Sequence, residues 1–312
     1  ASAGTSNTRV GVNAGNSIQS GGNYNTVVGD EAGTAITTGD ENTAIGSESL
    51  DALNTGQYNT AVGKGTLSAD TKGNQSTAVG TNALQTQNFT SDTNSLNTAV
   101  GYSAGQAVTT GTLNTLIGGL AGDAITTGGA NVAVGYRSLS ATTTASSNTA
   151  IGVDALTSNT TGTSNTAVGR DTLNQQTTAS YNTALGHQAL NLNTSGANNT
   201  ASGYRALYAN TTGTRNVAVG TTSLDANTTA NDNTALGYDA MSSNTTGQMN
   251  VAVGTYAFDA NTTGDFNVAV GRVALSTNTT ADFNTALGYA ALEVNTTGTQ
   301  NTAVGAGALD SN

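Results

Sequence analysis

The 312-residue chain contains no cysteine, no proline and no tryptophan, and it has a single histidine. Without cysteine there are no disulfides, thiolate metal sites or cysteine nucleophiles, and one histidine alone makes neither a catalytic triad nor a metal cluster. Lys and Arg number 8 against 19 Asp and Glu, a formal charge of −11 that disfavours nucleic acid and anionic membranes as partners. No apolar run of about 18 residues occurs, so the sequence predicts no membrane span in this segment.

The sequence contains instead one repeated phrase, Asn-Thr-Ala-Val-Gly, as in residues 165–169. Its versions begin at position 7 and occur 18 times, and 15 of the 17 spacings equal 17 residues. The unit reads Asn-Thr-Ala-Val-Gly-x-x-Ala-Leu-x-x-Asn-Thr-Thr-Gly-x-x, and we number its positions 1 to 17 from the first Asn. A fixed period of this kind predicts stacked repeats rather than a globular domain.

The repeat also defines the expected domain organisation. We expect a leading segment over residues 1–6 and a single elongated repeat domain over residues 7–312. Four extra residues within 85–96 predict a surface loop, because insertions in stacked repeats map to turns. The last copy stops at the twelfth position, which indicates a piece of a longer protein.

Seventeen residues are too few for the helix pairs of helical repeats, and Asn-Thr-Thr-Gly is typical of turns. The sequence therefore predicts an all-β fold, a parallel β-solenoid (β-roll) of about 18 coils with 17 residues per coil. We expect strands at positions 1–4 and 8–11, Asn ladders at positions 1 and 12, and a core made by aliphatic side chains at position 4 and at position 9 or 12. The small residues at positions 3 and 8 predict close approach of neighbouring chains, so we expect a trimer.

Two substitution patterns within the chain carry further information. Where position 9 is Gly (Gly15, Gly33, Gly105, Gly122), position 12 is Ile or Val, which predicts that both positions fill the same space. Position 5 is Gly in all 18 copies, which predicts a positive φ or a close backbone approach at a corner. These structural corner glycines include Gly46, Gly63, Gly152, Gly169, Gly186 and Gly305.

The candidate surface sites lie at variable or turn positions. Exposed tyrosines in a row at position 6 are either an adhesive aromatic edge or covers of the neighbouring coil, and they are Tyr102, Tyr136, Tyr204, Tyr238 and Tyr289. Asn-x-Ser/Thr sequons at position 12 are either turn residues or glycosylation sites, and they are Asn159, Asn193, Asn210, Asn227, Asn244, Asn261, Asn278 and Asn295. His187 is interpreted as a surface residue. No catalytic, metal or cofactor site is expected, and we expect no enzymatic activity.

The repeat resembles known surface proteins. Asn-Thr-Ala-Val-Gly-x-x-Ala is similar to the head repeats of trimeric autotransporter adhesins, and the whole unit resembles the repeats of phage tail-fibre and bacterial fibre proteins. The resemblance covers residues 7–312. It implies a trimeric, left-handed β-roll that serves as a fibre or adhesive head on a cell or virion surface.

These observations favour a non-enzymatic structural and adhesive fibre segment, a rigid repetitive spacer with multivalent surface or glycan binding. The expected partners are further copies of the chain and a cell-surface glycan or protein receptor, in an extracellular location. The first alternative is a self-assembling extracellular filament or sheath subunit. The second is ice binding through threonine rows at positions 2, 13 and 14.

Overall fold

A computed structural model describes residues 4–311. Residues 1–3 of the expected leading segment and residue 312 of the expected repeat domain lie outside the described residues. The chain divides into two compact units, residues 1–161 and 162–312. The described residues of each unit are all-β and form a parallel β-solenoid with one short strand per 17-residue coil, which confirms the predicted fold class. No helix long and apolar enough to cross a membrane occurs in residues 4–311.

The strands are short. Each copy of the 17-residue repeat has one at positions 2–4, and two further strands, Gly73–Asn74 and Thr93–Asn94, pair with each other outside this row. In the first unit they are β1 Thr8–Val10, β2 Thr26–Val28, β3 Thr43–Ile45, β4 Thr60–Val62, β5 Gly73–Asn74, β6 Thr77–Val79, β7 Thr93–Asn94, β8 Thr98–Val100, β9 Thr115–Ile117, β10 Val132–Val134 and β11 Thr149–Ile151. In the second unit they are β12 Thr166–Val168, β13 Thr183–Leu185, β14 Thr200–Ser202, β15 Val217–Val219, β16 Thr234–Leu236, β17 Val251–Val253, β18 Val268–Val270, β19 Thr285–Leu287 and β20 Thr302–Val304.

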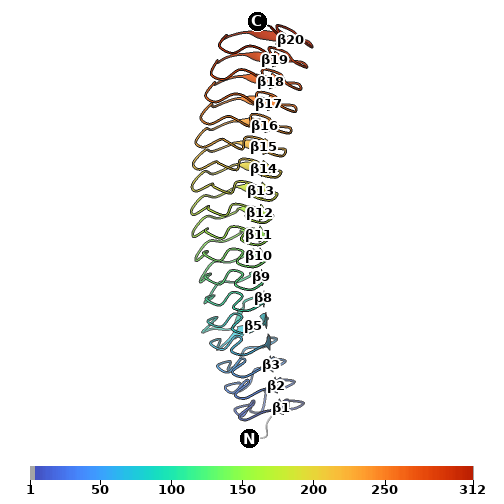
Figure 1. The fold of residues 1–312 in the computed structure, drawn as a ribbon. Coiled ribbons are helices and arrows are strands. Elements are labelled where there is room, and N and C mark those ends of the chain that lie inside the picture. The colour runs from blue at the N-terminus through green and yellow to red at the C-terminus, as the bar shows by residue number, and fades with distance from the viewer. Residues whose placement is uncertain (1–3, 312) are drawn as a thin grey trace. The chain divides into compact units, whose positions relative to one another are not determined.

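Neighbouring coils pair in register within each unit. In β15 and β16, Ala218 lies beside Ala235, so the same position of the repeat recurs directly on the next coil. Figure 1 shows the strands lying one above another on the same side of successive coils. Every position of the 17-residue repeat therefore forms a row along the coils of its compact unit.

The predicted second strand at positions 8–11 is wrong, because this stretch is a pair of tight turns. In the coil that begins at residue 42, Ser49 N–H donates to Gly46 O at 3.3 Å and Leu53 N–H donates to Leu50 O at 3.2 Å. Glu48 and Leu50, at positions 7 and 9, have φ of 58° and 52°. A left-handed residue at every second position cannot continue a strand.

The interior of each coil is formed by positions 3, 8 and 9. In β15 and the turn after it, Ala218, Ser223 and Leu224 are fully buried. Val217 and Val219, at positions 2 and 4, point outward, because successive side chains of a strand face opposite sides. The prediction that position 4 forms the core is therefore wrong. The small residues at positions 3 and 8 make room inside the coil and do not face a neighbouring chain, so they do not support a trimer.

The predicted exchange between positions 9 and 12 is confirmed. A Cβ built on Gly122 would lie 2.8 Å from Ile125 Cδ1 and 2.8 Å from Leu116 Cδ2. Ile125, at position 12, thus occupies the space that a leucine fills where position 9 is Leu. Leu116 replaces the usual alanine at position 3 and fills the remainder, a contribution that the sequence pattern did not reveal.

The predicted Asn ladder at position 1 is confirmed and is buried. The main-chain N–H of Asn250 donates to Asn233 Oδ1 at 3.0 Å, and Asn250 Nδ2 donates to Gly264 O at 2.8 Å. Asn250 Oδ1 in turn accepts from the main-chain N–H of Asn267 at 2.8 Å. Each asparagine therefore links its coil to the preceding coil through its main-chain N–H and to the following coil through its side-chain oxygen.

A second ladder runs through position 12, as predicted. The Nδ2 of each asparagine donates to the Oδ1 of the asparagine one coil earlier at 2.8 to 3.0 Å, in the series Asn193, Asn210, Asn227, Asn244 and Asn261. The interior of the second unit thus contains both aliphatic and amide side chains. The amides of this series are hydrogen-bonded to one another, which is the condition for burying them at low cost.

The position-1 ladder is interrupted next to the insertion within 85–96, and the side chain of a glutamine bridges the gap. Ser76 stands where the other copies have Asn. The buried Gln87 donates to Ser76 Oγ at 2.9 Å and to Asp70 Oδ2 at 2.7 Å, and its Oε1 accepts from Asn97 Nδ2 at 2.9 Å. The exposed turn at residues 90–92 leads into β7, which pairs in parallel with β5 beside the main row of strands.

Candidate interaction face

The outward side chains of positions 2 and 4 make one continuous surface in each unit, which we call the strand face. Position 4 carries Val, Ile or Leu in every copy except Ser202, and position 2 carries Thr or Val. Leu236 is 47% exposed and Leu287 is 46% exposed. In the second unit the central part of the strand face consists of Val217, Val219, Thr234, Leu236, Val251, Val253, Val268, Val270, Thr285 and Leu287.

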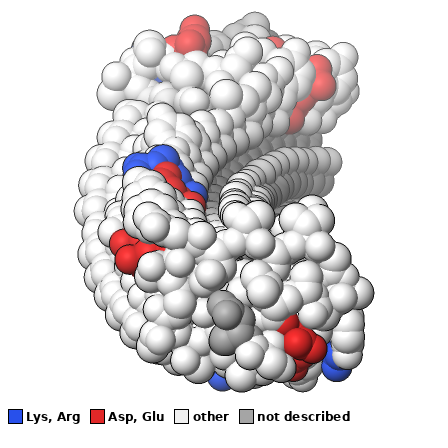
Figure 2. All heavy atoms as spheres, turned by 90° about the horizontal axis from the view of Figure 1, so that it is seen from above, with Lys and Arg blue, Asp and Glu red and all other residues white. Residues whose placement is uncertain are grey.

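The strand face carries no charge in any of the 18 copies, although the chain as a whole carries a formal charge of −11. Figure 2 shows the charged side chains as separate patches on a surface that is otherwise uncharged. A long exposed apolar row is unusual on a monomeric protein and indicates a contact surface. The strands beneath are already paired within their unit, so contact at this face uses side chains rather than backbone hydrogen bonds.

The corner glycines lie at the end of each strand and fix its exit. The six named in the sequence have φ between 124° and 135°. A Cβ on Gly46 would lie 2.6 Å from the carbonyl oxygen of Gly63, and a Cβ on Gly63 would lie 2.7 Å from the carbonyl carbon of Gly80. Both reasons for glycine therefore apply at Gly46 and Gly63, the dihedral angle and the close approach of the next coil, whereas at Gly305 only the dihedral angle applies, since the nearest atom is Ala308 Cβ at 3.9 Å.

The tyrosines at position 6 lie on the surface next to these corners. Their exposed fractions range from 47% for Tyr204 and Tyr238 to 61% for Tyr102. Tyr204 lies against His187 of the preceding coil with ring centroids 5.6 Å apart, and Tyr238 meets Tyr256 edge-on at 5.4 Å. In the second unit these rings thus contact neighbouring coils and still present about half of their surface to solvent.

The eight sequon asparagines are buried in the position-12 row. Their side chains are at most 1% exposed, and in Asn210 and Asn244 Nδ2 donates to the position-15 carbonyl at 3.0 Å. In both residues Nδ2 also donates to the asparagine of the preceding coil. A glycan would replace one of the two Nδ2 hydrogens, so one of these bonds would break and the buried turn would have to open. Glycosylation stays a prediction that an intact-mass measurement tests.

Within residues 4–311, no three or more His, Asp or Glu side chains lie together so as to hold a metal ion. His187 Nε2 lies 3.8 Å from Asp171 Oδ2 at the surface. At position 17, Arg215 forms a two-pronged ion pair with Asp232 at 2.6 and 2.7 Å, and this hydrogen bonding lowers the pKa of Asp232. Burial raises the pKa of four carboxyl groups at position 10, those of Asp51, Asp123, Asp225 and Asp259.

Comparison of the sequence with protein-family models and with curated proteins finds no match. The strand face therefore has to be interpreted from its own chemistry. Sequence reasoning missed this face because it assigned position 4 to the core. The signal was present in the alternation of the strand, since a buried Ala at position 3 places its two neighbours outside.

Proposed function

We propose that the chain is a non-enzymatic structural fibre segment, in which copies of the chain pack side by side through their strand faces. The observation that carries the proposal is the uncharged apolar row at positions 2 and 4. It is the surface on which identical chains with a formal charge of −11 meet without bringing charged groups together. Three copies, the arrangement implied by the resemblance to fibre proteins, would bury these rows against one another at an extracellular cell or virion surface.

The energetics require many coils to act together. Burying an exposed Val or Leu side chain completely is worth about 1.5–3 kcal/mol, and these side chains are already about half buried, so each coil contributes about 1 kcal/mol. Association itself costs about 4–15 kcal/mol. A few coils would not offset this cost, whereas the nine coils of one compact unit contribute about 9 kcal/mol, which is comparable to it. The repetitive length is thus what makes a weak contact sufficient.

The test is the mass of the chain in solution, measured by sedimentation velocity or light scattering. We expect about three times the chain mass of 30.7 kDa. The double variant Val219→Glu, Val253→Glu places charges on the strand face and should release monomers with an unchanged circular dichroism spectrum. The control Thr212→Glu changes an exposed residue at position 14 and should leave the mass unaltered. A monomeric wild type at high concentration would refute the proposal.

An adhesive role for the same fibre would use the tyrosines at position 6, which remain exposed while the strand faces are in contact. Replacing Tyr102, Tyr136, Tyr204, Tyr238 and Tyr289 with Ser should weaken attachment to cells without changing the oligomer mass. Unchanged attachment would assign these rings to covering the neighbouring coils.

Ice binding is a second candidate function, and one observation favours it. Threonines at position 14 are exposed in register along the second unit, among them Thr212, Thr229, Thr246 and Thr263. At position 13 the hydroxyls instead donate to the next coil, as Thr211 Oγ1 does to Thr228 O at 3.0 Å. A thermal hysteresis assay tests this function, and ice crystals of unaltered shape would dismiss it. End-to-end filament growth is tested by negative-stain microscopy over a range of concentrations.

A further inference from the structure

The insertion within 85–96 creates a surface pocket of about 290 Å³ in the first unit. It lies on the turn side of the coils, at positions 14–17, and not on the strand face. The lining residues come from two successive coils and from the insertion, and they are Thr55, Gln57, Tyr58, Asn74, Gln75, Asp92 and Asn94. β7 supplies the lower wall, because its pairing with β5 places Asn94 beside Asn74.

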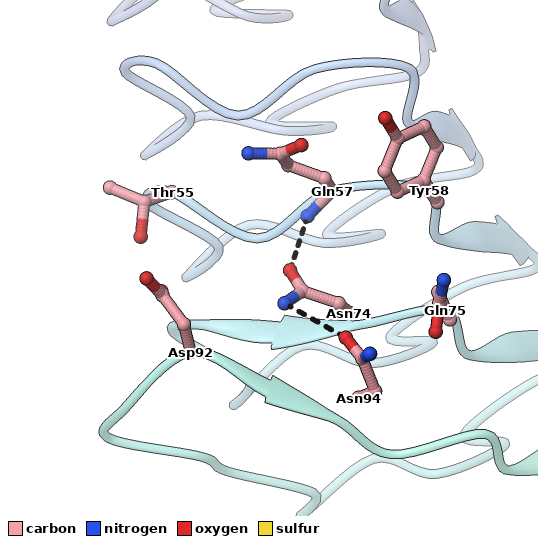
Figure 3. A pocket seen from close by; sticks show the side chains of 7 residues that line it. All are labelled: Thr55, Gln57, Tyr58, Asn74, Gln75, Asp92 and Asn94. Atoms are coloured by element: carbon pink, nitrogen blue, oxygen red, sulfur yellow. Dashed lines mark hydrogen bonds between the residues drawn. The ribbon is translucent and has the colours of Figure 1, made fainter.

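Figure 3 shows how these side chains are distributed around the pocket. Thr55 and Asp92 lie at one end, Tyr58 and Gln75 lie at the other, and three amide side chains lie between them. Two of those amides are held in place. The Oδ1 of Asn74 accepts from the main-chain N–H of Gln57 at 2.8 Å, and its Nδ2 reaches Asn94 Oδ1 at 3.5 Å.

The other polar groups in the pocket are available to a ligand. Within residues 4–311, the side chains of Thr55, Gln57, Gln75 and Asp92 and the hydroxyl of Tyr58 make no hydrogen bond to the protein. They offer hydroxyl and amide donors, together with amide and carboxylate acceptors, over a small area. The Tyr58 ring is 51% exposed and supplies the one extended apolar surface in the set.

We propose that this pocket binds one neutral sugar residue of a glycan. A sugar ring carries hydroxyls that both donate and accept, which matches amides and a carboxylate, and it has an apolar face that packs on an aromatic ring. None of the seven lining residues is basic, which disfavours phosphate and anionic sugars. A single carboxylate is a poor cation site, and the polar lining disfavours an apolar ligand. The volume of about 290 Å³ lies just below the usual range for small-molecule sites.

The proposal is independent of the fibre role, because it concerns a different surface of the chain. It also differs from the tyrosine row at position 6, since the insertion that builds this pocket occurs once in the chain. One sugar site of this size gives weak binding. Adhesion through it would depend on several copies of the chain being held together.

Saturation-transfer NMR on the full chain tests the inference, with free glucose, galactose, mannose, fucose and N-acetylglucosamine as probes. We expect transfer to at least one of them, with affinity reduced about tenfold or more in Tyr58→Ser and in Asp92→Ala, a loss of about 1.4 kcal/mol or more. Serine stands naturally at position 17 in other copies, as at Ser147 and Ser164, so Tyr58→Ser is compatible with the fold. Thermal melting monitored by circular dichroism checks that both variants remain folded.

The matched control is Tyr181→Ser, which removes an exposed tyrosine from the same position of a regular coil. It should bind the sugar as the wild type does. No transfer to any of the five sugars would overturn the proposal. So would binding that survives in both pocket variants, or binding that Tyr181→Ser reduces equally. A monomeric chain that binds sugar would contradict the fibre proposal and leave this inference intact.

Discussion

Replacing Asn250 with Ala should destabilise the second unit by about 1.5–4.5 kcal/mol, from one buried group left without a partner and one further hydrogen bond lost. The change removes the acceptor for the buried main-chain N–H of Asn267, which is left without a partner, and one of the two donors to Gly264 O, which keeps its bond from Asn261 Nδ2 at 3.2 Å. Each buried group left without a partner costs about 1–3 kcal/mol. The Nδ2 of Asn267 is not counted, because it keeps its bond to Ala281 O at 2.9 Å.

Asn301→Ala is the control, because the same position of the repeat loses less there. Asn301 Nδ2 donates to Asn284 Oδ1 at 3.1 Å, and the main-chain N–H of Asn301 continues to donate to that oxygen at 3.0 Å after the substitution. We expect a loss of about 0.5–1.5 kcal/mol, the net value of one hydrogen bond.

The measurement is urea unfolding followed by circular dichroism, combined with hydrogen exchange. Stacked repeats contact only their neighbours, so the defect should appear locally before it appears in the global transition. In Asn250→Ala, amide exchange should accelerate first at Asn267 and in the adjoining coils. A variant within about 0.5 kcal/mol of the wild type, or one no worse than Asn301→Ala, would show that the amide ladder does not stabilise the stack.

Three further predictions concern other parts of the unit. Gly118→Ala should abolish folding or lower the melting temperature by many degrees, because φ is 136° there and the new Cβ would lie 2.5 Å from a carbonyl oxygen of the next coil. The control Gly119→Ala should melt like the wild type, because its Cβ meets only a ring carbon at 3.7 Å. As a single substitution, Gly122→Leu should destabilise the first unit, and adding Ile125→Asn should restore its stability. A double-mutant cycle should give a coupling of about 0.5–3 kcal/mol between the two substitutions, and additive effects would contradict the shared space. Burial raises the pKa of Asp259 above its ordinary value of 3.8, so its contribution to stability is present below that pH and is lost as the pH rises through the raised pKa. Asp259→Asn should therefore stabilise the chain near pH 7 and have little effect near pH 3, as urea midpoints at the two pH values would show; equal effects at both would refute the assignment.

The period of the sequence was sufficient to predict the stacking of coils, because a 17-residue unit has few other ways to bury its apolar side chains. It also predicted both ladders, since identical residues in register must lie on one another. The shared space of positions 9 and 12 followed from comparing copies, as the contacts around Gly122 show. These features depend only on periodicity and side-chain volume.

The turns and the pocket were beyond this reasoning. Leucine at position 9 is left-handed in every copy that carries it, with φ of 52° at Leu50 and 54° at Leu275, although bulky residues rarely adopt this conformation. The main-chain N–H of Leu50 donates to Thr66 O of the next coil at 3.0 Å, and its carbonyl accepts from Leu53 N–H of the same turn at 3.2 Å. A single copy of the repeat contains no sign of the bond to the next coil. The pocket depends on how one irregular insertion folds, which no repeated position specifies.

The rows of like residues have a consequence for how such a chain changes over generations. Each coil presents its neighbours with the same amides, the same strand and the same corner, so a whole coil inserted or deleted by recombination rejoins surfaces that already match. An insertion of any other length requires its own compensating side-chain hydrogen bonds, such as those of Gln87 with Asp70, Ser76 and Asn97. Genetic variation should therefore alter the extent of this protein in steps of 17 residues, and departures from that step mark the places where something other than length has been selected.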